Sequence, residues 1–196
     1  MAELRIGCLV MAAGSGSRFG RNKLEAVVDG KSLLRRSLEA VPAEEFAQVT
    51  VVTQYDAAAA LAEEFGFTVV RNDRPEDGLS RTVRLGTEAM AGCDAILYQV
   101  ADQPLLEQET VRRELEYFRT HPDHIVGLAH NGVRGNPCIF PRKFFPELMA
   151  LEGDVGGNVV LKAHPDALLL YETSAAELRD VDTVEVLAAV QEDRQI

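Results

Sequence analysis

Strand-like and helix-like segments alternate along most of the chain, and this order constrains the fold more than any other feature. Apolar or β-branched runs, typical of strands covered on both faces, occupy residues 4–11, 49–53, 67–71, 94–100, 125–129, 138–140 and 167–171. Helical spacing of apolar residues, or a helix-breaking residue at the end, marks residues 31–41, 57–65, 78–90, 107–119, 154–164 and 183–192. This alternation predicts an α/β fold with a mainly parallel sheet.

The chain length predicts one domain over residues 1–196, since 196 residues can bury a substantial core. Residues 130–160 break the alternation, and we interpret them as a small insertion over the functional site. No apolar run approaches the ~20 residues of a membrane span. The first residues lack the charged and apolar regions of a signal peptide. We therefore expect a cytoplasmic protein with no membrane partner.

The charge distribution favours a small anionic ligand over a nucleic acid. The formal net charge is −11, whereas nucleic-acid-binding proteins usually present a basic face. Residues 18–36, however, hold six basic and two acidic side chains. The three cysteines are scattered and form no Cys-x-x-Cys pair, which predicts reduced thiols rather than disulfides or a zinc site.

A glycine- and serine-rich loop follows the first strand, in the run Met11-Ala-Ala-Gly-Ser-Gly-Ser-Arg-Phe-Gly-Arg-Asn-Lys23. Such a loop can turn backbone N–H groups toward a phosphate, since glycine has no Cβ to block the approach. The spacing matches neither the dinucleotide fingerprint nor the P-loop. We predict a third kind of phosphate loop, in which Arg18 and Lys23 neutralise a triphosphate; a basic turn without function is the alternative.

Parallel strands place their carboxyl ends at one edge, so residues 12–23, 72–80 and 101–104 should meet there. Asp102 directly follows an apolar strand, where a carboxylate beside phosphates suits Mg²⁺; a turn cap is the alternative. Asp180 and Asp182 precede the last helix. Either could instead form a capping box with Glu185.

The loop sequence resembles the signature of MobA-like NTP transferases, and within them the molybdenum cofactor cytidylyltransferases. The resemblance continues over nearly the whole chain, in the runs at residues 31–34, 72–80, 101–105, 134–137, 153–156 and 180–183. It implies a three-layer Rossmann-like nucleotidyltransferase fold with a mainly parallel sheet. It also implies transfer of CMP from CTP to the phosphate of a molybdopterin-type acceptor, and a recipient molybdoenzyme is a further partner that this function allows.

The resemblance also implies roles for individual residues. Arg18, Lys23 and Asp102 would be catalytic, and Asp102 and Asp182 would hold Mg²⁺. The loop from residue 180 would reach back to the metal or the acceptor. CTP would be bound by Ala12, Ala13, Gly14, Ser15, Gly16, Arg18, Lys23, Asn72, Gly78 and Ser80.

Some positions depart from the family pattern and leave alternatives open. The family often has histidine at the position of Asn136 and arginine at that of Asn158, and usually glycine at that of Ala101. Guanylyl relatives usually have glycine where Ala13 stands. A related transferase that uses GTP or a sugar phosphate, or a non-catalytic pterin carrier, therefore remains an alternative. The failed fingerprint disfavours a nicotinamide oxidoreductase.

Overall fold

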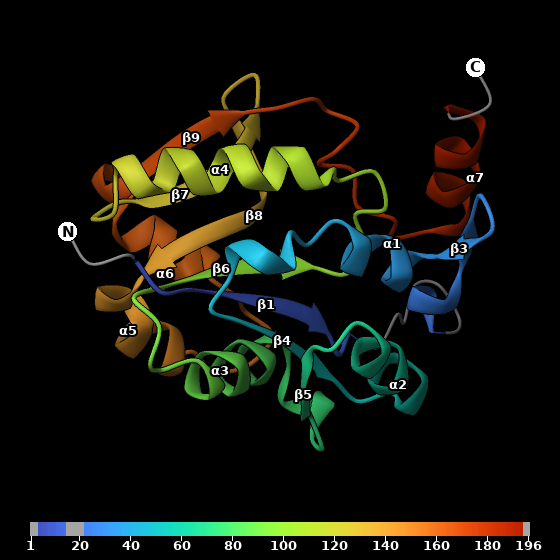
Figure 1. Ribbon diagram of the computed structural model, residues 1–196, viewed down its shortest axis with the longest axis horizontal. Helices are drawn as coiled ribbons and strands as arrows, with labels where there is room; N and C mark the ends of the chain where they lie inside the picture. The colour runs from blue at the N-terminus through green and yellow to red at the C-terminus, as the bar shows by residue number, and fades with distance from the viewer. Residues whose placement is uncertain (1–3, 15–21, 194–196) are drawn as a thin grey trace.

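A computed structural model describes residues 4–14 and 22–193, and its centre is a seven-stranded sheet (Figure 1). The strand order across this sheet is β5-β4-β1-β6-β8-β7-β9. Its strands are β1 (Ile6–Ala12), β4 (Gln48–Thr53), β5 (Thr68–Arg71), β6 (Ala95–Val100), β7 (Ile125–His130), β8 (Val133–Pro141) and β9 (Leu168–Glu172). The short strands β2 (Val27–Val28) and β3 (Lys31–Ser32) form a separate hairpin.

The sheet is mainly parallel, as the alternation of segments predicts. β1 pairs in parallel with both β4 and β6, β4 with β5, and β7 with β9. β8 runs antiparallel between β6 and β7. Its pairing with β6 runs from Ala95 opposite Pro141 to Tyr98 opposite Cys138.

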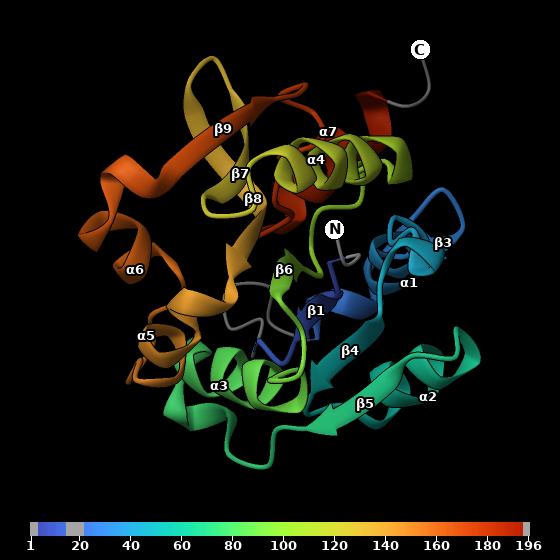
Figure 2. The same ribbon diagram turned by 60° about the vertical axis from the view of Figure 1, so that its left-hand side comes forward.

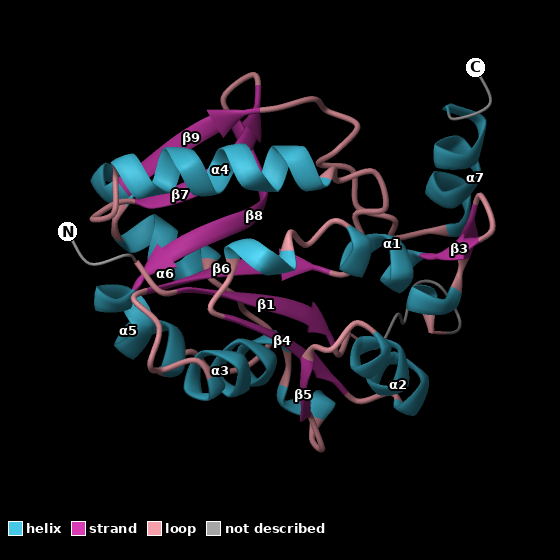
Figure 3. Cartoon of the chain, viewed as in Figure 1, coloured by secondary structure: helices cyan, strands magenta, loops and turns pink. Residues whose placement is uncertain are grey.

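Helices cover both faces of the sheet, which gives the expected three layers (Figure 3). On one face, α1, α2 and α4 pack against side chains such as Val10 and Leu97; on the other, α3, α5 and α6 pack against side chains such as Leu9 and Phe140. Figure 2 shows α3 and α5 side by side on the second face. The helices are α1 (Leu33–Glu39), α2 (Asp56–Glu64), α3 (Leu79–Ala89), α4 (Gln108–Thr120), α5 (Phe145–Met149), α6 (Asn158–Ala163) and α7 (Val184–Asp193).

Several shorter features complete the chain. α7 packs on the β2–β3 hairpin through Leu187 and Val190, which contact a small cluster around Val28 (Figure 1). Single turns of 3-10 helix occur at Lys23–Glu25, Ala43–Glu45, Pro75–Asp77, Arg142–Phe144 and Pro165–Ala167. Among the described residues, no helix combines the length and the apolar character needed to cross a membrane.

The prediction for residues 130–160 is partly wrong. Residues 133–141 are β8, an integral strand of the sheet, and β7 and β8 form a hairpin. The predicted segment 138–140 covers only part of this strand. The first half of the strand, Val133–Asn136, carries few apolar side chains and therefore does not read as an apolar run. The helix expected from residue 154 begins at Asn158, after a glycine-containing turn.

Candidate functional site

The segment after β1 is held by side chains that follow β4. Three consecutive carbonyl groups accept hydrogen bonds: Ala12 from Thr53 Oγ1 (2.9 Å), Ala13 from Gln54 Nε2 (2.7 Å) and Gly14 from the Tyr55 hydroxyl (2.9 Å). Because the peptide unit is planar and trans, the N–H groups of Ala13 and Gly14 point the opposite way from the carbonyls of the same peptide units. The backbone here is thus fixed with the N–H groups of Ala13 and Gly14 turned away from the side chains that hold it.

Lys23 lies between two aspartates at the carboxyl end of the sheet. Its Nζ is 2.5 Å from Asp102 Oδ2 and 2.9 Å from Asp182 Oδ1. Burial alone would lower the pKa of Lys23, but the charges of Asp102 and Asp182 and their hydrogen bonds raise it above its ordinary value. Lys23 therefore remains a cation and links two segments that are far apart in sequence.

The loop between β9 and α7 reaches back to Asp102. Val181 N donates a hydrogen bond to the backbone oxygen of Asp102 (2.9 Å), and Gln103 Nε2 donates to Asp180 Oδ1 (2.9 Å). Burial, together with the nearby charge of Asp102, raises the pKa of Asp180 to about 6.

The alternative interpretation, a capping box of Asp180 or Asp182 with Glu185, is absent from the described part of this loop. Thr183 Oγ1 accepts from Val186 N instead, which leaves Asp182 to contact Lys23. Threonine is among the preferred N-cap residues, so the start of the helix does not require either aspartate.

Asp102 offers one carboxylate oxygen for a cation. Oδ2 contacts Lys23, whereas Oδ1 is buried and has no hydrogen-bond partner among the described residues. An unpartnered buried oxygen is costly, so a bound cation is a physical reason to retain it. Within residues 4–14 and 22–193, no three carboxylate, histidine or cysteine groups converge on one metal position. One or two carboxylates suit Mg²⁺, which completes its shell with water and phosphate oxygens.

These groups border a cavity of about 150 Å³ at the ends of β1 and β6. The described residues that line it include Ala12, Ala13, Gly14, Lys23 and Asp102, so five of the predicted site residues come together. Leu24, Leu79 and Thr82 also line it. Leu79 belongs to the run 72–80 that carries the resemblance, whereas no role was predicted for Leu24 or Thr82. Ser15, Gly16 and Arg18 lie outside the described residues.

Three other residues that the resemblance assigns to CTP binding do not line this cavity: Asn72, Gly78 and Ser80. The buried Asn72 side chain donates to Thr82 Oγ1 (3.2 Å) and accepts from Arg81 Nε (3.0 Å). Ser80 N donates to the oxygen of Gly153, and Gly78 packs against the same residue. None of the three is among the described residues that line the cavity; their contacts position the start of α3 beside it.

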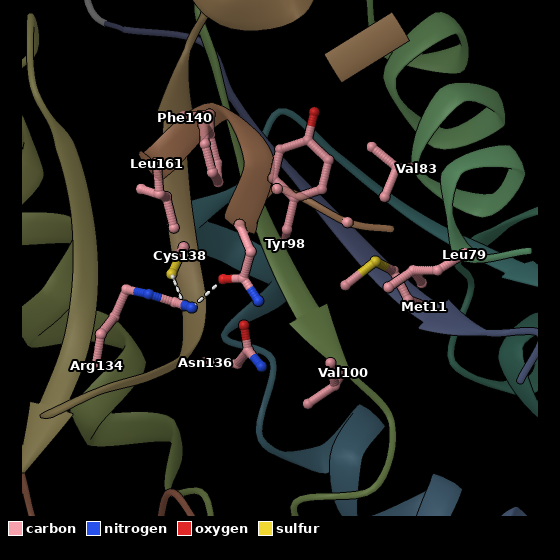
Figure 4. Close-up of a pocket in the computed structure, with 13 residues that line it drawn as sticks. Met11, Leu79, Val83, Tyr98, Val100, Arg134, Asn136, Cys138, Phe140 and Leu161 are labelled. Atoms are coloured by element: carbon pink, nitrogen blue, oxygen red, sulfur yellow. Dashed lines mark hydrogen bonds between the residues drawn. The ribbon is translucent and has the colours of Figure 1, made fainter. Parts of the chain in front are cut away.

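A second cavity, of about 110 Å³, lies beside the first. Met11, Leu79 and Val100 line both cavities. The walls of the second cavity are mostly apolar, and Figure 4 shows Phe140, Leu161 and Tyr98 grouped at one end. Arg134 lies at the opposite end, beside Asn136. Asn136 and Asn158, which depart from the family pattern, line this cavity together with Arg134, for which no role was predicted.

Comparison with known protein families matches residues 8–168, most of the chain, to the MobA-like NTP transferase domain. The chain belongs to this family. The protein is therefore of the nucleotidyltransferase class.

Individual relatives have low sequence identity to this chain. Purine catabolism protein PucB from Bacillus subtilis (strain 168) is 24% identical over 188 residues, which cover 89% of this chain and 90% of PucB. Rv0371c from Mycobacterium tuberculosis H37Rv is 22% identical, with a TM-score of 0.81 over 97% of this chain and 100% of that one; a structure of the same protein is a complex with manganese. CMP:2-keto-3-deoxy-manno-octonic acid synthetase complexed with CTP is 16% identical, with a TM-score of 0.76 over 97% of this chain and 98% of that one.

The cysteines of the MobA-like protein do not contribute a nucleophile to this site. Cys8, Cys93 and Cys138 are buried and not disulfide-bonded. Burial raises the pKa of all three thiols, that of Cys138 to about 11. A thiol with a raised pKa holds little reactive thiolate near neutral pH.

Proposed function

We propose that the protein transfers CMP from CTP to the phosphate of a molybdenum-pterin cofactor, with Mg²⁺ as the metal and pyrophosphate as the leaving group. The observation that carries this proposal is the contact of Lys23 with Asp102 and Asp182 beside the fixed backbone of Ala12–Gly14. The CTP bound to the synthetase and the manganese bound to Rv0371c support the choice of nucleotide and of a divalent metal. The pterin acceptor rests on the sequence resemblance.

The proposed reaction is an in-line displacement at phosphorus. An oxygen of the acceptor phosphate forms a bond to the α-phosphorus of CTP while the bond between that phosphorus and the oxygen bridging to the β-phosphorus breaks. The electron pair of the broken bond leaves with pyrophosphate. Such a step needs positioning and charge neutralisation rather than a protein nucleophile.

The residues of the first cavity fit these needs. The N–H groups of Ala13 and Gly14 would bind phosphate oxygens, and Lys23 would turn from Asp102 to the departing phosphates. Asp102 and Asp182 would hold Mg²⁺, which supplies further neutralisation of phosphate charge when bound. Arg18, which lies outside the described residues, is proposed as a second cation on the triphosphate.

Pyrophosphate release tests the proposal. With CTP, Mg²⁺ and molybdopterin, we expect turnover that exceeds turnover with GTP, because the methyl group of Ala13 restricts the approach of a purine. Release with GTP or a sugar phosphate alone would favour the related transferase. Pterin binding without pyrophosphate release would favour the carrier.

Substitution of Asp102 tests the site itself. Asp102→Ala should reduce turnover roughly a hundredfold or more, since it removes a group that neutralises charge in the transition state. Asp56→Ala is the matched control, because Asp56 is an exposed aspartate that pairs with Arg71 on the surface. Full turnover by the Asp102→Ala variant would show that the assigned role is wrong.

A further inference from the structure

We propose that Arg134 binds the anionic group of the acceptor, and that the apolar cavity behind it holds a flat ring of the same molecule. This inference rests on the proposed nucleotidyl transfer and names the acceptor class: a ring compound that carries a phosphate or another anion. Arg134 is thereby given a binding role, although it lies outside the glycine loop and away from the loops that carry Asp102, Asp180 and Asp182.

The lining of the second cavity separates one charge from a large apolar wall. Among the described residues around it, Arg134 is the only charged side chain. The apolar wall comes from three strands and two helices: Met11, Val100 and Phe140 lie on strands, and Leu79, Val83 and Leu161 lie on helices. Figure 4 shows Arg134 and this wall facing each other across the cavity. A ligand that fills it needs an apolar body and an anionic end.

Tyr98 adds to the apolar character of the wall. Its hydroxyl is hydrogen-bonded to Thr87 Oγ1 (2.8 Å) and, in Figure 4, points away from Arg134. The ring therefore presents carbon atoms to the cavity. A sugar would leave hydroxyl groups unpaired against this wall, at a cost for each one, whereas a flat heterocycle can pack on it.

Arg134 is held in place but not neutralised. Its guanidinium donates to the oxygen of Gly135 (2.8 Å), to Cys138 Sγ (3.3 Å) and to Asn158 Oδ1. All three acceptors are uncharged. An arginine that is half-buried with neutral partners retains its attraction for an anion, and its planar fork suits the two oxygens of a phosphate or carboxylate.

Arg134 also borders a further cavity. It lines the second cavity and a third one of about 470 Å³, which Gln103 and Asp180 also line. The second cavity adjoins the first, which Lys23 and Asp102 line, because Met11, Leu79 and Val100 line both. An anion on Arg134 would thus lie at the border of the second and third cavities, on the side of the loop that carries Asp180.

Two glycines beside α6 keep open the second cavity, which would hold the ring. A Cβ at Gly157 would lie 2.8 Å from the Phe140 ring, and one at Gly156 would lie 2.9 Å from Leu79 Cδ2. Any side chain at these positions would crowd two walls of the cavity. The same turn brings Asn158 to Arg134, so one short segment both shapes the cavity and orients the cation.

Fluorescence titration with two pterins tests the assignment without CTP. Pterin-6-carboxylate carries a flat ring and an anion, and 6-hydroxymethylpterin carries the ring alone. Arg134→Gln should raise the Kd of pterin-6-carboxylate roughly tenfold or more, since it removes a charge-assisted hydrogen bond. The Kd of 6-hydroxymethylpterin should change less than about twofold. Arg134→Lys, which keeps the charge and loses the fork, should give an intermediate Kd for the carboxylate.

The controls separate this assignment from a structural effect. Arg113→Gln removes an exposed arginine that pairs with Glu109 on α4, and it should leave both Kd values unchanged. Equal weakening of both pterins by Arg134→Gln, or no binding of either pterin to the wild-type protein, would overturn the assignment. Failed cytidylyl transfer with intact probe binding would reject the proposed reaction and leave Arg134 as an anion-binding residue.

Discussion

Lys23 supplies positive charge where two aspartates face each other. Asp102 and Asp182 are far apart in the sequence, and the side chains of Lys23 and Asp102 are each 16% exposed. Without the lysine, the two carboxylates would repel across a partly buried space. Lys23 therefore stabilises the ligand-free site, and it competes with any divalent cation for Asp102.

This competition gives a prediction for metal binding. Lys23→Met should bind Mn²⁺ at least roughly fivefold more tightly than the wild type in the absence of nucleotide, because a competing positive charge is removed. Electron paramagnetic resonance of free Mn²⁺ measures the difference. Lys31→Met, which removes an exposed lysine paired with Glu39, should bind Mn²⁺ as the wild type does. Unchanged affinity in Lys23→Met would mean that these carboxylates form no cation site.

Single residues could be predicted from the sequence when they sit at a strand end or in a glycine loop. Lys23 and Asp102 are of this kind, and the structure brings them together. The hydrogen bonds of Gln54 and Tyr55 to the loop after β1 could not be predicted. They join side chains to backbone groups 41 residues away, and no local pattern marks such contacts.

At the scale of elements, the start of α3 is joined to the turn before α6. Gly78 has φ of +86°, and a Cβ there would lie 2.6 Å from the carbonyl of Gly153. Leu79 N donates to Asp154 Oδ1 (3.2 Å), and Ser80 N donates to the oxygen of Gly153 (3.2 Å). The turn thus caps α3 from outside and carries α6 to the edge of the second cavity.

A substitution at this junction should destabilise the protein. Gly78→Ala should lower the free energy of unfolding by about 2 kcal/mol or more, because both its backbone conformation and its contact with Gly153 exclude a side chain. Urea denaturation measures this change. Gly92→Ala is the control, since a Cβ at Gly92 meets nothing within 4 Å. Equal stability of the two variants would contradict the junction described here.

Strands β1, β4 and β6 could be predicted closely because they are buried on both faces and read as apolar or β-branched runs. The start of β8 could not, since Val133–Asn136 lies on a hairpin with partly exposed side chains. The late start of α6 has a similar cause. Its preceding turn is shaped by contacts with α3 and Phe140, which are distant in sequence.

At the scale of the whole molecule, one carboxyl group is buried under α4. Glu114 is fully buried in the helix face that covers the sheet, and neither of its side-chain oxygens has a hydrogen-bond partner in the part of the chain that the structure describes. Burial raises the pKa of Glu114 well above its ordinary value. The folded protein therefore holds this proton to a higher pH than the unfolded chain does.

This proton makes stability depend on pH. Above about pH 4.3, where an exposed glutamate ionises, the folded state binds more protons than the unfolded state. The free energy of unfolding contributed by Glu114 therefore falls as pH rises toward its folded pKa. Glu114→Gln lacks this loss, so its midpoint of thermal unfolding should exceed that of the wild type by a margin that grows from pH 4.5 to pH 8. Glu116→Gln, an exposed neighbour on the same helix, should show no such growth, and parallel profiles for Glu114→Gln would contradict the assignment.

The fold class could be predicted from the alternation of segments, but the order of the strands could not. Nothing local indicates that β8 enters between β6 and β7 and runs against them. That choice depends on which apolar faces pack together when the chain is complete, and Ile139 and Phe140 of β8 belong to cores on opposite faces.

The antiparallel strand β8 joins the two halves of the sheet through one short pairing with β6. β1, β4, β5 and β6 form one half of the sheet, and β7, β8 and β9 form the other; within the sheet, the pairing of Ala95–Tyr98 with Cys138–Pro141 joins them. The pairing stops at Tyr98, so the two halves separate beyond it, at the place where the ring cavity begins. Substitutions on the β8 side can therefore reshape the second cavity while the strands of the other half, which end at the first cavity, keep their pairing.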